Sequence, residues 1–177
     1  MNHSSKISIG SVTEWLSQAV YDVSETMFSQ AAYPARPLEK SVESGEVLVA
    51  CIGIRGDCHL EVALYFSQTL ASRLASLSLE MPPAELDEKM IDDVAGEFSN
   101  MVVGAVKSRI SDLEIVCAMT VPHVLRGTAG APDLVQKVNA AFAVIRGSAG
   151  PKDSAAPALT HLVFHVGEAL LHLDVQL

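Results

Sequence analysis

The sequence predicts an α+β fold, a mostly antiparallel sheet of about six strands with about three helices packed on one face. Three observations support this expectation. Apolar residues recur at helical spacing in three segments, several shorter segments alternate or run continuously apolar, and two pairs of the shorter segments meet at glycine-containing turns. With 177 residues, 49% of them hydrophobic, the chain is expected to form one domain spanning residues 1–177.

The N-terminal half is expected to supply a helix, a hairpin and a second helix. Residues 11–30 place apolar side chains one helical turn apart, and prolines follow the segment. Residues 46–54 and 58–66 form two strands that turn at Gly56-Asp57, because these residue types suit the backbone angles of a tight turn. The second strand alternates, which predicts that it is half-buried. Residues 67–79 form a shorter amphipathic helix.

The C-terminal half begins with the longest element. Pro82 and Pro83 are expected to open a helix that runs from Ala84 to about Ile110, since proline is tolerated in a first helical turn. The remaining elements are a strand at 113–120, a loop at 126–132, a strand at 135–145, a surface loop at 148–157 and a hairpin of 159–166 with 169–175.

Composition excludes several classes of function. A net charge of −9 without a Lys/Arg cluster argues against nucleic acid as a partner. Apolar runs fall short of the roughly 20 residues of a membrane span, and the first ten residues do not resemble a secretory signal, so a cytoplasmic protein without a membrane partner is expected. Three cysteines without a C-x-x-C pair predict reduced, inert core thiols. His161 and His165 lie about 13 Å apart on a strand, too far to share a metal ion, and only a cross-strand pairing brings His172 near either; exposed or partner-facing histidines are expected.

A stripe along the long helix is the candidate site. At about 100° per residue, five residues share one exposed flank: Asp93, Glu97, Asn100, Gly104 and Lys107. The adjoining core face is expected to hold Ile91, Val94, Phe98, Met101, Val102 and Ala105. Asn and Gly both weaken a helix, so their placement one turn apart favours a site that a partner approaches closely. An ordinary solvated flank, or a Gly104 packed against a neighbouring helix, is the alternative.

The segment 92–104, DDVAGEFSNMVVG, resembles the helix motif of the CheC/CheX/FliY phosphatases of bacterial chemotaxis, in which an acidic residue precedes Glu-x-x-Asn, an apolar pair and a glycine. The segment 121–127, VPHVLRG, is similar to the family's stretch after that helix. The chain carries a single Glu-x-x-Asn motif of this kind, and this resembles the CheX type. The resemblance implies a CheC/CheX-like fold and a homodimer.

The resemblance also implies an activity, hydrolysis of the aspartyl phosphate of a CheY-type response regulator. Asn100 then positions the attacking water, and Glu97 docks to the regulator's lysine. The protein needs no cofactor of its own, because the Mg²⁺ belongs to the partner response regulator. An amide both donates and accepts, so it can hold a water and a phosphoryl oxygen together. A non-catalytic CheX-like binding module, docking a response regulator or another signalling protein, is the alternative function.

Overall fold

The computed structural model describes residues 7–35, 45–147 and 159–177. The helices in these residues are α1 (Ile9–Phe28), α2 (Gln68–Leu79), the 3₁₀ turn η3 (Pro83–Glu85), α3 (Glu88–Asp112) and α4 (Pro132–Arg146). The strands are β1 (Ala32–Pro34), β2 (Glu46–Gly56), β3 (Leu60–Ser67), β4 (Cys117–Met119), β5 (His123–Thr128), β6 (Thr160–Val166) and β7 (Ala169–Gln176).

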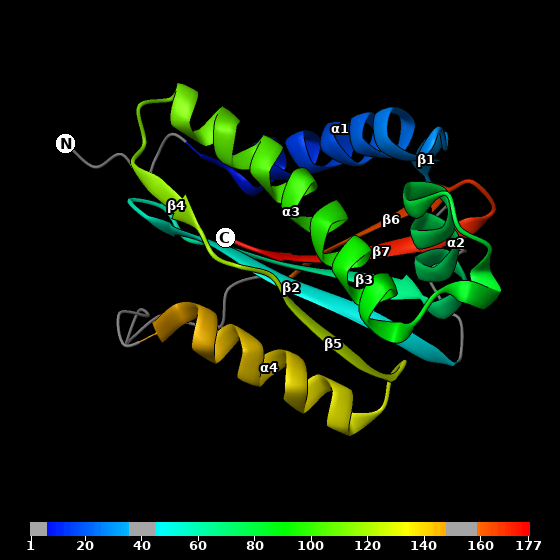
Figure 1. Ribbon diagram of the computed structural model, residues 1–177. Helices are drawn as coiled ribbons and strands as arrows, with labels where there is room; N and C mark the ends of the chain where they lie inside the picture. Colours follow the sequence, from blue (N-terminus) through cyan, green and yellow to red (C-terminus); the bar gives the residue numbers. More distant parts are fainter. Residues whose placement is uncertain (1–6, 36–44, 148–158) are drawn as a thin grey trace.

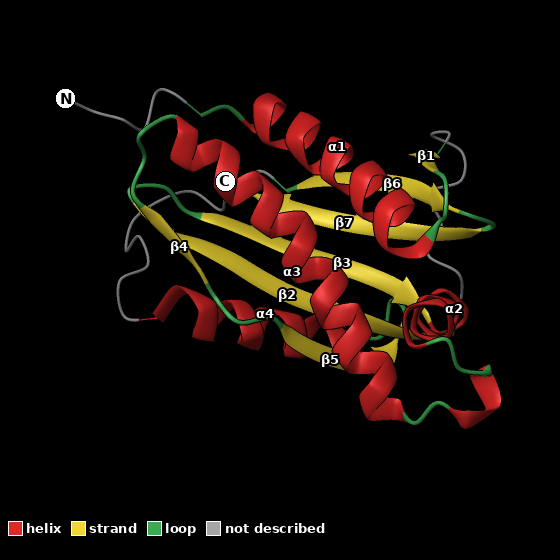
Figure 2. Cartoon of the chain, turned by 45° about the horizontal axis from the view of Figure 1, so that its top comes forward, coloured by secondary structure: helices red, strands yellow, loops and turns green. Residues whose placement is uncertain are grey.

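Seven strands in the described residues form one sheet in the order β1-β6-β7-β3-β2-β4, and β5 also pairs with β2. Every pairing is antiparallel. Figure 1 shows α1 and α3 on one face of the sheet and α4 on the other, and Figure 2 shows α3 running obliquely across the strands. The predicted α+β class with an antiparallel sheet is confirmed.

Both predicted hairpins are present, β2 with β3 and β6 with β7. At the first turn, Gly56 has a φ of 139°, in the region that favours glycine. A Cβ atom on Gly56 would lie 2.3 Å from the carbonyl oxygen of Val116, the residue that precedes β4. The turn therefore requires glycine both for its backbone angle and for the close approach of β4.

The strand predicted at 135–145 is wrong, because this segment lies within α4. The apolar residues that α4 buries recur at the spacing of a helix, and they are Leu134, Val138, Ala141, Phe142 and Ile145. Pro132 occupies the first turn, where a missing N–H costs nothing. Helices consequently cover both faces of the sheet rather than one. The predicted alternation of β3 is present, because its core face is buried while Glu61 and Tyr65 on the second face are half-buried. The exception is Ala63, which α4 buries on that second face.

Three element boundaries also differ from expectation. Pro83 opens η3, and α3 begins only at Glu88, because the Asp87 side chain accepts a hydrogen bond of 2.8 Å from the Met90 N–H and caps the helix there. Within the strand predicted at 113–120, only the three residues of β4 form a strand. The first residues of the loop predicted at 126–132 belong to β5. The surface loop predicted at 148–157 lies outside the described residues.

The two layers have separate hydrophobic clusters. The larger one lies between the sheet and helices α1, α2 and α3, and the smaller one lies between the sheet and α4. Among the described helices, none combines the length and apolar character needed to cross a membrane.

Candidate functional site

Aromatic packing fixes α3 on the larger cluster. Phe98 is fully buried, and its ring lies 5.7 Å from that of Phe28 in α1 and 5.6 Å from that of Phe66 in β3. Edge-to-face and tilted ring pairs at this spacing are favourable beyond the area they bury. Because Phe98 directly follows Glu97 in the chain, its burial fixes the rotation of α3 about its own axis. That rotation determines the direction in which the Glu97 side chain points.

The buried side of α3 is broader than predicted and is centred further round the helix. Ile91, Val94, Phe98 and Val102 are buried as expected, and Met101 is half-buried. Ala105 is exposed, so its assignment to the core was wrong. The helix instead buries Val103, Val106 and Ile110 in its second half, since α3 packs against strand β2 as well as against α1.

The predicted stripe forms an outward-facing ledge, by which we mean Asp93, Glu97, Asn100, Gly104 and Lys107. Asp93 and Glu97 are exposed, while Asn100, Gly104 and Lys107 are half-buried. Within the described residues, neither Glu97 nor Asn100 makes a hydrogen bond or ion pair with another side chain or with backbone outside its own helix ladder. Both side chains are therefore available to a partner, one helical turn apart on the same flank.

Two glycines of α3 face β4, β5 and the residues between these strands. A Cβ on Gly96 would lie 3.4 Å from Val124 Cγ2 and 3.9 Å from Pro122 Cγ. A Cβ on Gly104 would lie 3.9 Å from Met119 Cε. These are ordinary van der Waals distances, so Gly104 leaves space beside the ledge but borders a methionine from β4. The neighbour of Gly104 is thus a strand, not the helix considered from the sequence.

Arg126 of β5 ties down the N-terminal turns of α3. Its Nε donates to Asp92 Oδ1 at 3.0 Å, and its Nη2 lies 2.7 Å from the same oxygen. Nη2 also donates to the Glu88 carbonyl at 3.1 Å, and Nη1 donates to Gln68 Oε1 at 3.4 Å. One guanidinium therefore joins β5, α2 and α3 a little more than one turn before Glu97. Arg126 lies in the segment 121–127, but the sequence alone did not predict this contact.

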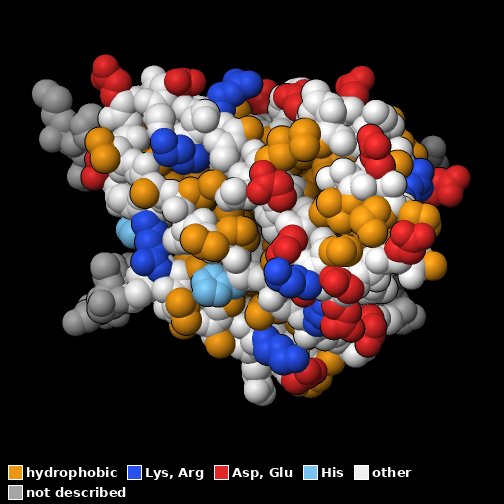
Figure 3. Space-filling model, in the orientation of Figure 1, with side chains coloured by type: hydrophobic (Ala, Val, Ile, Leu, Met, Phe, Trp, Pro, Cys, Tyr) orange, Lys and Arg blue, Asp and Glu red, His pale blue; other side chains and the backbone are white. Residues whose placement is uncertain are grey.

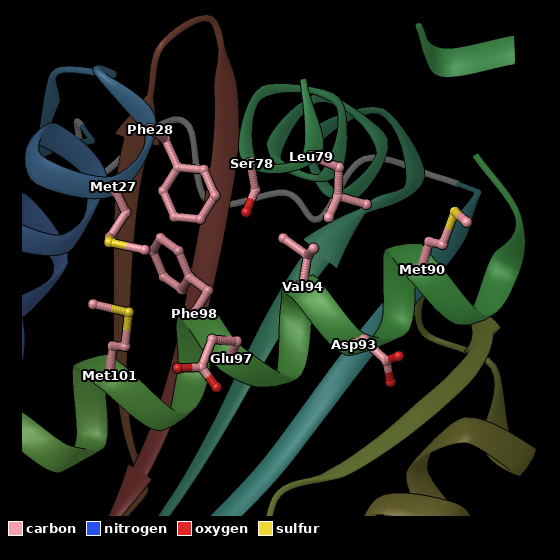
Figure 4. Close-up of a pocket in the computed structure, with 10 residues that line it drawn as sticks. All are labelled: Met27, Phe28, Ser78, Leu79, Met90, Asp93, Val94, Glu97, Phe98 and Met101. Carbon is pink, nitrogen blue, oxygen red and sulfur yellow. The ribbon is translucent and has the colours of Figure 1, made fainter. Parts of the chain in front are cut away.

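A hollow opens on the other side of the ledge, between the C-terminal ends of α1 and α2 and the middle of α3 (Figure 4). Its volume is about 360 Å³, and ten residues line it: Met27, Phe28, Ser78, Leu79, Met90, Asp93, Val94, Glu97, Phe98 and Met101. Asp93 and Glu97 belong to both the ledge and the hollow. The sequence did not reveal the hollow, because three separated helices contribute its walls.

His161 is exposed as predicted, but His172 is not. His172 is 3% exposed, whereas an exposed or partner-facing side chain was expected. His161 Nε2 lies 3.2 Å from His172 Nδ1 across β6 and β7, and His161 Nδ1 lies 2.6 Å from Asp174 Oδ1. Burial, and then the neighbouring His161, lower the pKa of His172. No group of three or more metal-binding side chains occurs among the described residues.

The three cysteines are free thiols. Cys51 is buried, and burial raises its pKa to about 12. Cys58 and Cys117 are half-buried, and burial followed by the contact with Cys117 raises the pKa of Cys58 to about 11. Because a thiol must ionise to act as a nucleophile, the raised pKa values argue against a nucleophilic role for Cys51 and Cys58 at neutral pH.

Comparison with known proteins identifies relatives of this arrangement. The model of the family described as chemotaxis phosphatase CheX matches residues 48–145, which run from within β2 to the last turn of α4 and include all of α3. No match is found among curated proteins.

Solved structures share the fold. The chemotaxis protein CheX of Desulfovibrio desulfuricans superposes with a TM-score of 0.66 at 15% identity, covering 93% of this chain and 97% of that chain. The chemotaxis protein CheX of Vibrio vulnificus gives 0.67 at 18% identity, covering 93% and 95%. A CheX–CheY–BeF₃–Mg²⁺ complex from Borrelia burgdorferi gives 0.60 at 13% identity, covering 93% and 96%. At these identities the likeness shows the fold alone.

Proposed function

The chain belongs to the CheX family of chemotaxis phosphatases, and we propose that it hydrolyses the aspartyl phosphate of a CheY-type response regulator. Asn100 positions the attacking water, and Glu97 docks to a lysine of the regulator. One observation carries the proposal: Glu97 and Asn100 lie on one outward ledge of a firmly packed helix, without internal hydrogen-bond partners in the described residues.

The chemistry asks little of the enzyme beyond positioning. Water attacks the phosphorus, the bond between phosphorus and the aspartyl oxygen breaks, and inorganic phosphate leaves while the regulator regains its carboxylate. The Asn100 amide accepts a hydrogen bond from the water and donates one to a phosphoryl oxygen. The Mg²⁺ that offsets phosphoryl charge is expected in the regulator, as the Borrelia complex of a CheX with a CheY, BeF₃ and Mg²⁺ suggests.

Electrostatics of the ledge suit such a dock. Its N-terminal part is acidic, with Asp93 and Glu97, and its C-terminal part carries Lys107. A lysine on the regulator is attracted to Glu97, and acidic groups around a phosphorylation site are attracted to Lys107. Opposite charges at the two ends of the ledge would orient the partner along α3.

The expected homodimer remains a prediction that sedimentation analysis can check.

The test uses CheY-type regulators from the same genome, phosphorylated with acetyl phosphate. The protein should accelerate phosphate release from at least one of them, and Asn100→Ala should lower kcat by about 100-fold, the scale of losing one group that acts only in the transition state. Glu97→Ala should mainly raise KM. Asn139→Ala, an exposed amide on α4, is the matched control.

Three results would decide between functions. A full rate with Asn100→Ala would refute the catalytic role of that residue. A regulator that binds without losing phosphate any faster would identify a binding module, the alternative function. Retained binding by Asn100→Ala with lost hydrolysis would support the phosphatase.

A further inference from the structure

The hollow beside Glu97 is an apolar surface open to solvent. Met27 is 46% exposed and Leu79 is 40% exposed, although both point into it (Figure 4). Its volume of about 360 Å³ exceeds the 150 Å³ or so that suffices for a benzene molecule. Three methionines, Met27, Met90 and Met101, line the walls. Methionine side chains adapt to differently shaped apolar groups, so these walls are suited to receiving one.

Acidic groups border this apolar surface. The carboxylates of Asp93 and Glu97 point away from the hollow at its outer edge (Figure 4). Neither makes an ion pair with another residue in the part of the chain that the structure describes. In Figure 3, hydrophobic side chains lie on both sides of α3 with acidic side chains between them. A partner that presents an apolar side chain next to a cationic side chain would complement these apolar walls and their acidic edge.

A regulator that docks on Asn100 with an interface of standard size would extend over the hollow. A stable interface occupies about 800 Å² on each partner, which corresponds to a disc of roughly 16 Å radius. Met90 lies about 15 Å along the helix axis from Asn100, at 1.5 Å per residue. Leu79 and Met27 line the same hollow as Glu97. A regulator centred on Asn100 would therefore either fill the hollow or trap water against apolar walls, which is the less favourable arrangement.

We propose that the hollow binds an apolar side chain that the phosphorylated response regulator presents beside the lysine that meets Glu97. This inference rests on the proposed function and deepens it, since it assigns the contact that provides affinity separately from the residue that acts on phosphate. The ledge supplies catalysis and charge recognition. The hollow, through Met27 and Leu79, supplies the pocket for an apolar anchor of the regulator, and such anchors in pockets dominate many interfaces.

The experiment substitutes the exposed walls of the hollow and leaves the ledge intact. Met27→Gln and Leu79→Gln add a polar amide at positions already open to solvent, so the fold should survive. Val144→Gln on α4, 64% exposed on the opposite face, is the matched control. Each hollow variant should raise KM for the phosphorylated regulator about tenfold with kcat unchanged. The Kd for the BeF₃-activated regulator should rise by the same factor, and the control should change neither.

The outcomes separate this inference from the proposed function. Unchanged KM and Kd in both hollow variants, with an active wild type, would overturn the inference while the phosphatase stands. If no regulator is dephosphorylated but one binds, the phosphatase fails, and the Kd series still decides whether the hollow contributes. If the variants instead convert a dimer to a monomer in sedimentation with Kd unchanged, a second copy occupies the hollow and the inference is wrong.

Discussion

Removing the ion pair between Arg126 and Asp92 should lower the free energy of unfolding, because the pair holds α3, the helix that carries the site, on β5. The two side chains meet in two contacts, of 2.7 and 3.0 Å, to one carboxylate oxygen, and they are 28% and 32% exposed. The informative variants are Arg126→Met, which keeps the aliphatic stem, and Asp92→Asn, which keeps the shape but removes the charge. A double-mutant cycle on this pair isolates their interaction from everything else that each residue does.

The magnitude follows from the partial burial. Fully exposed pairs contribute between 0 and about 1 kcal/mol, and hydrogen bonds to charged groups contribute about 1.5–3 kcal/mol when shielded. At roughly 30% exposure, water screens the pair incompletely, and we expect a coupling free energy of about 1 kcal/mol. Arg126→Met should cost about 2 kcal/mol in total, because it also removes the donors to the Glu88 carbonyl and Gln68.

Urea unfolding of the wild type, both single variants and the double variant measures these values. The exposed pair Lys137–Asp133 within α4, at 3.5 Å, is the matched control cycle and should give about 0.3 kcal/mol. If the Arg126–Asp92 coupling is no larger than that of the control, the bridge does not hold α3 on β5. The idea that it positions the site would then be refuted.

Three further predictions follow from the packing. Phe98→Ala should lower the unfolding free energy by about 3–5 kcal/mol in urea titration, because it opens a cavity between two buried rings; a loss below about 1 kcal/mol would contradict the packing described. Burial lowers the folded-state pKa of His172, so the unfolded chain binds its proton first as the pH falls. Stability should decline from about pH 6.5 downward until the folded histidine also protonates, and His172→Gln should flatten this part of the profile; an identical slope in the variant would exclude His172 as the cause. Gly56→Ala should destabilise the protein by more than the roughly 1 kcal/mol typical of strained backbone, since its Cβ would meet the Val116 carbonyl; thermal unfolding unchanged within error would contradict that turn geometry.

The parts of the fold that the sequence predicted correctly are those encoded by local patterns. Successive side chains of residues 58–66 alternate between an apolar face and a second face. A Gly-Asp pair at 56–57 marks the turn before them, so the first hairpin was recognisable. α4 was missed because a short segment of small and apolar residues fits either a strand or a helix until its period is counted. That error propagated, since a helix on the far face buries Ala63 and changes the number of covered faces.

The candidate site shows the same division between local and long-range information. Helical geometry alone places Glu97 and Asn100 on one flank, and the structure keeps both on the ledge. The hollow, the Arg126 bridge and the cross-strand pairing of His161 with His172 each join residues at least 11 positions apart. Such contacts depend on how helices and strands pack, and no single segment contains the information for them.

An enzyme that acts through one amide needs that amide to be held still, because a misplaced group loses most of the advantage of positioning. α3 is restrained on two sides: by the Phe98 rings towards α1 and β3, and by β5, where Val124 lies beside Gly96 and Arg126 binds Asp92. The ledge is on the outward side. The same packing that holds the backbone of α3 therefore also leaves the half-buried Asn100 side chain accessible, and a partner can reach it without any rearrangement of the core.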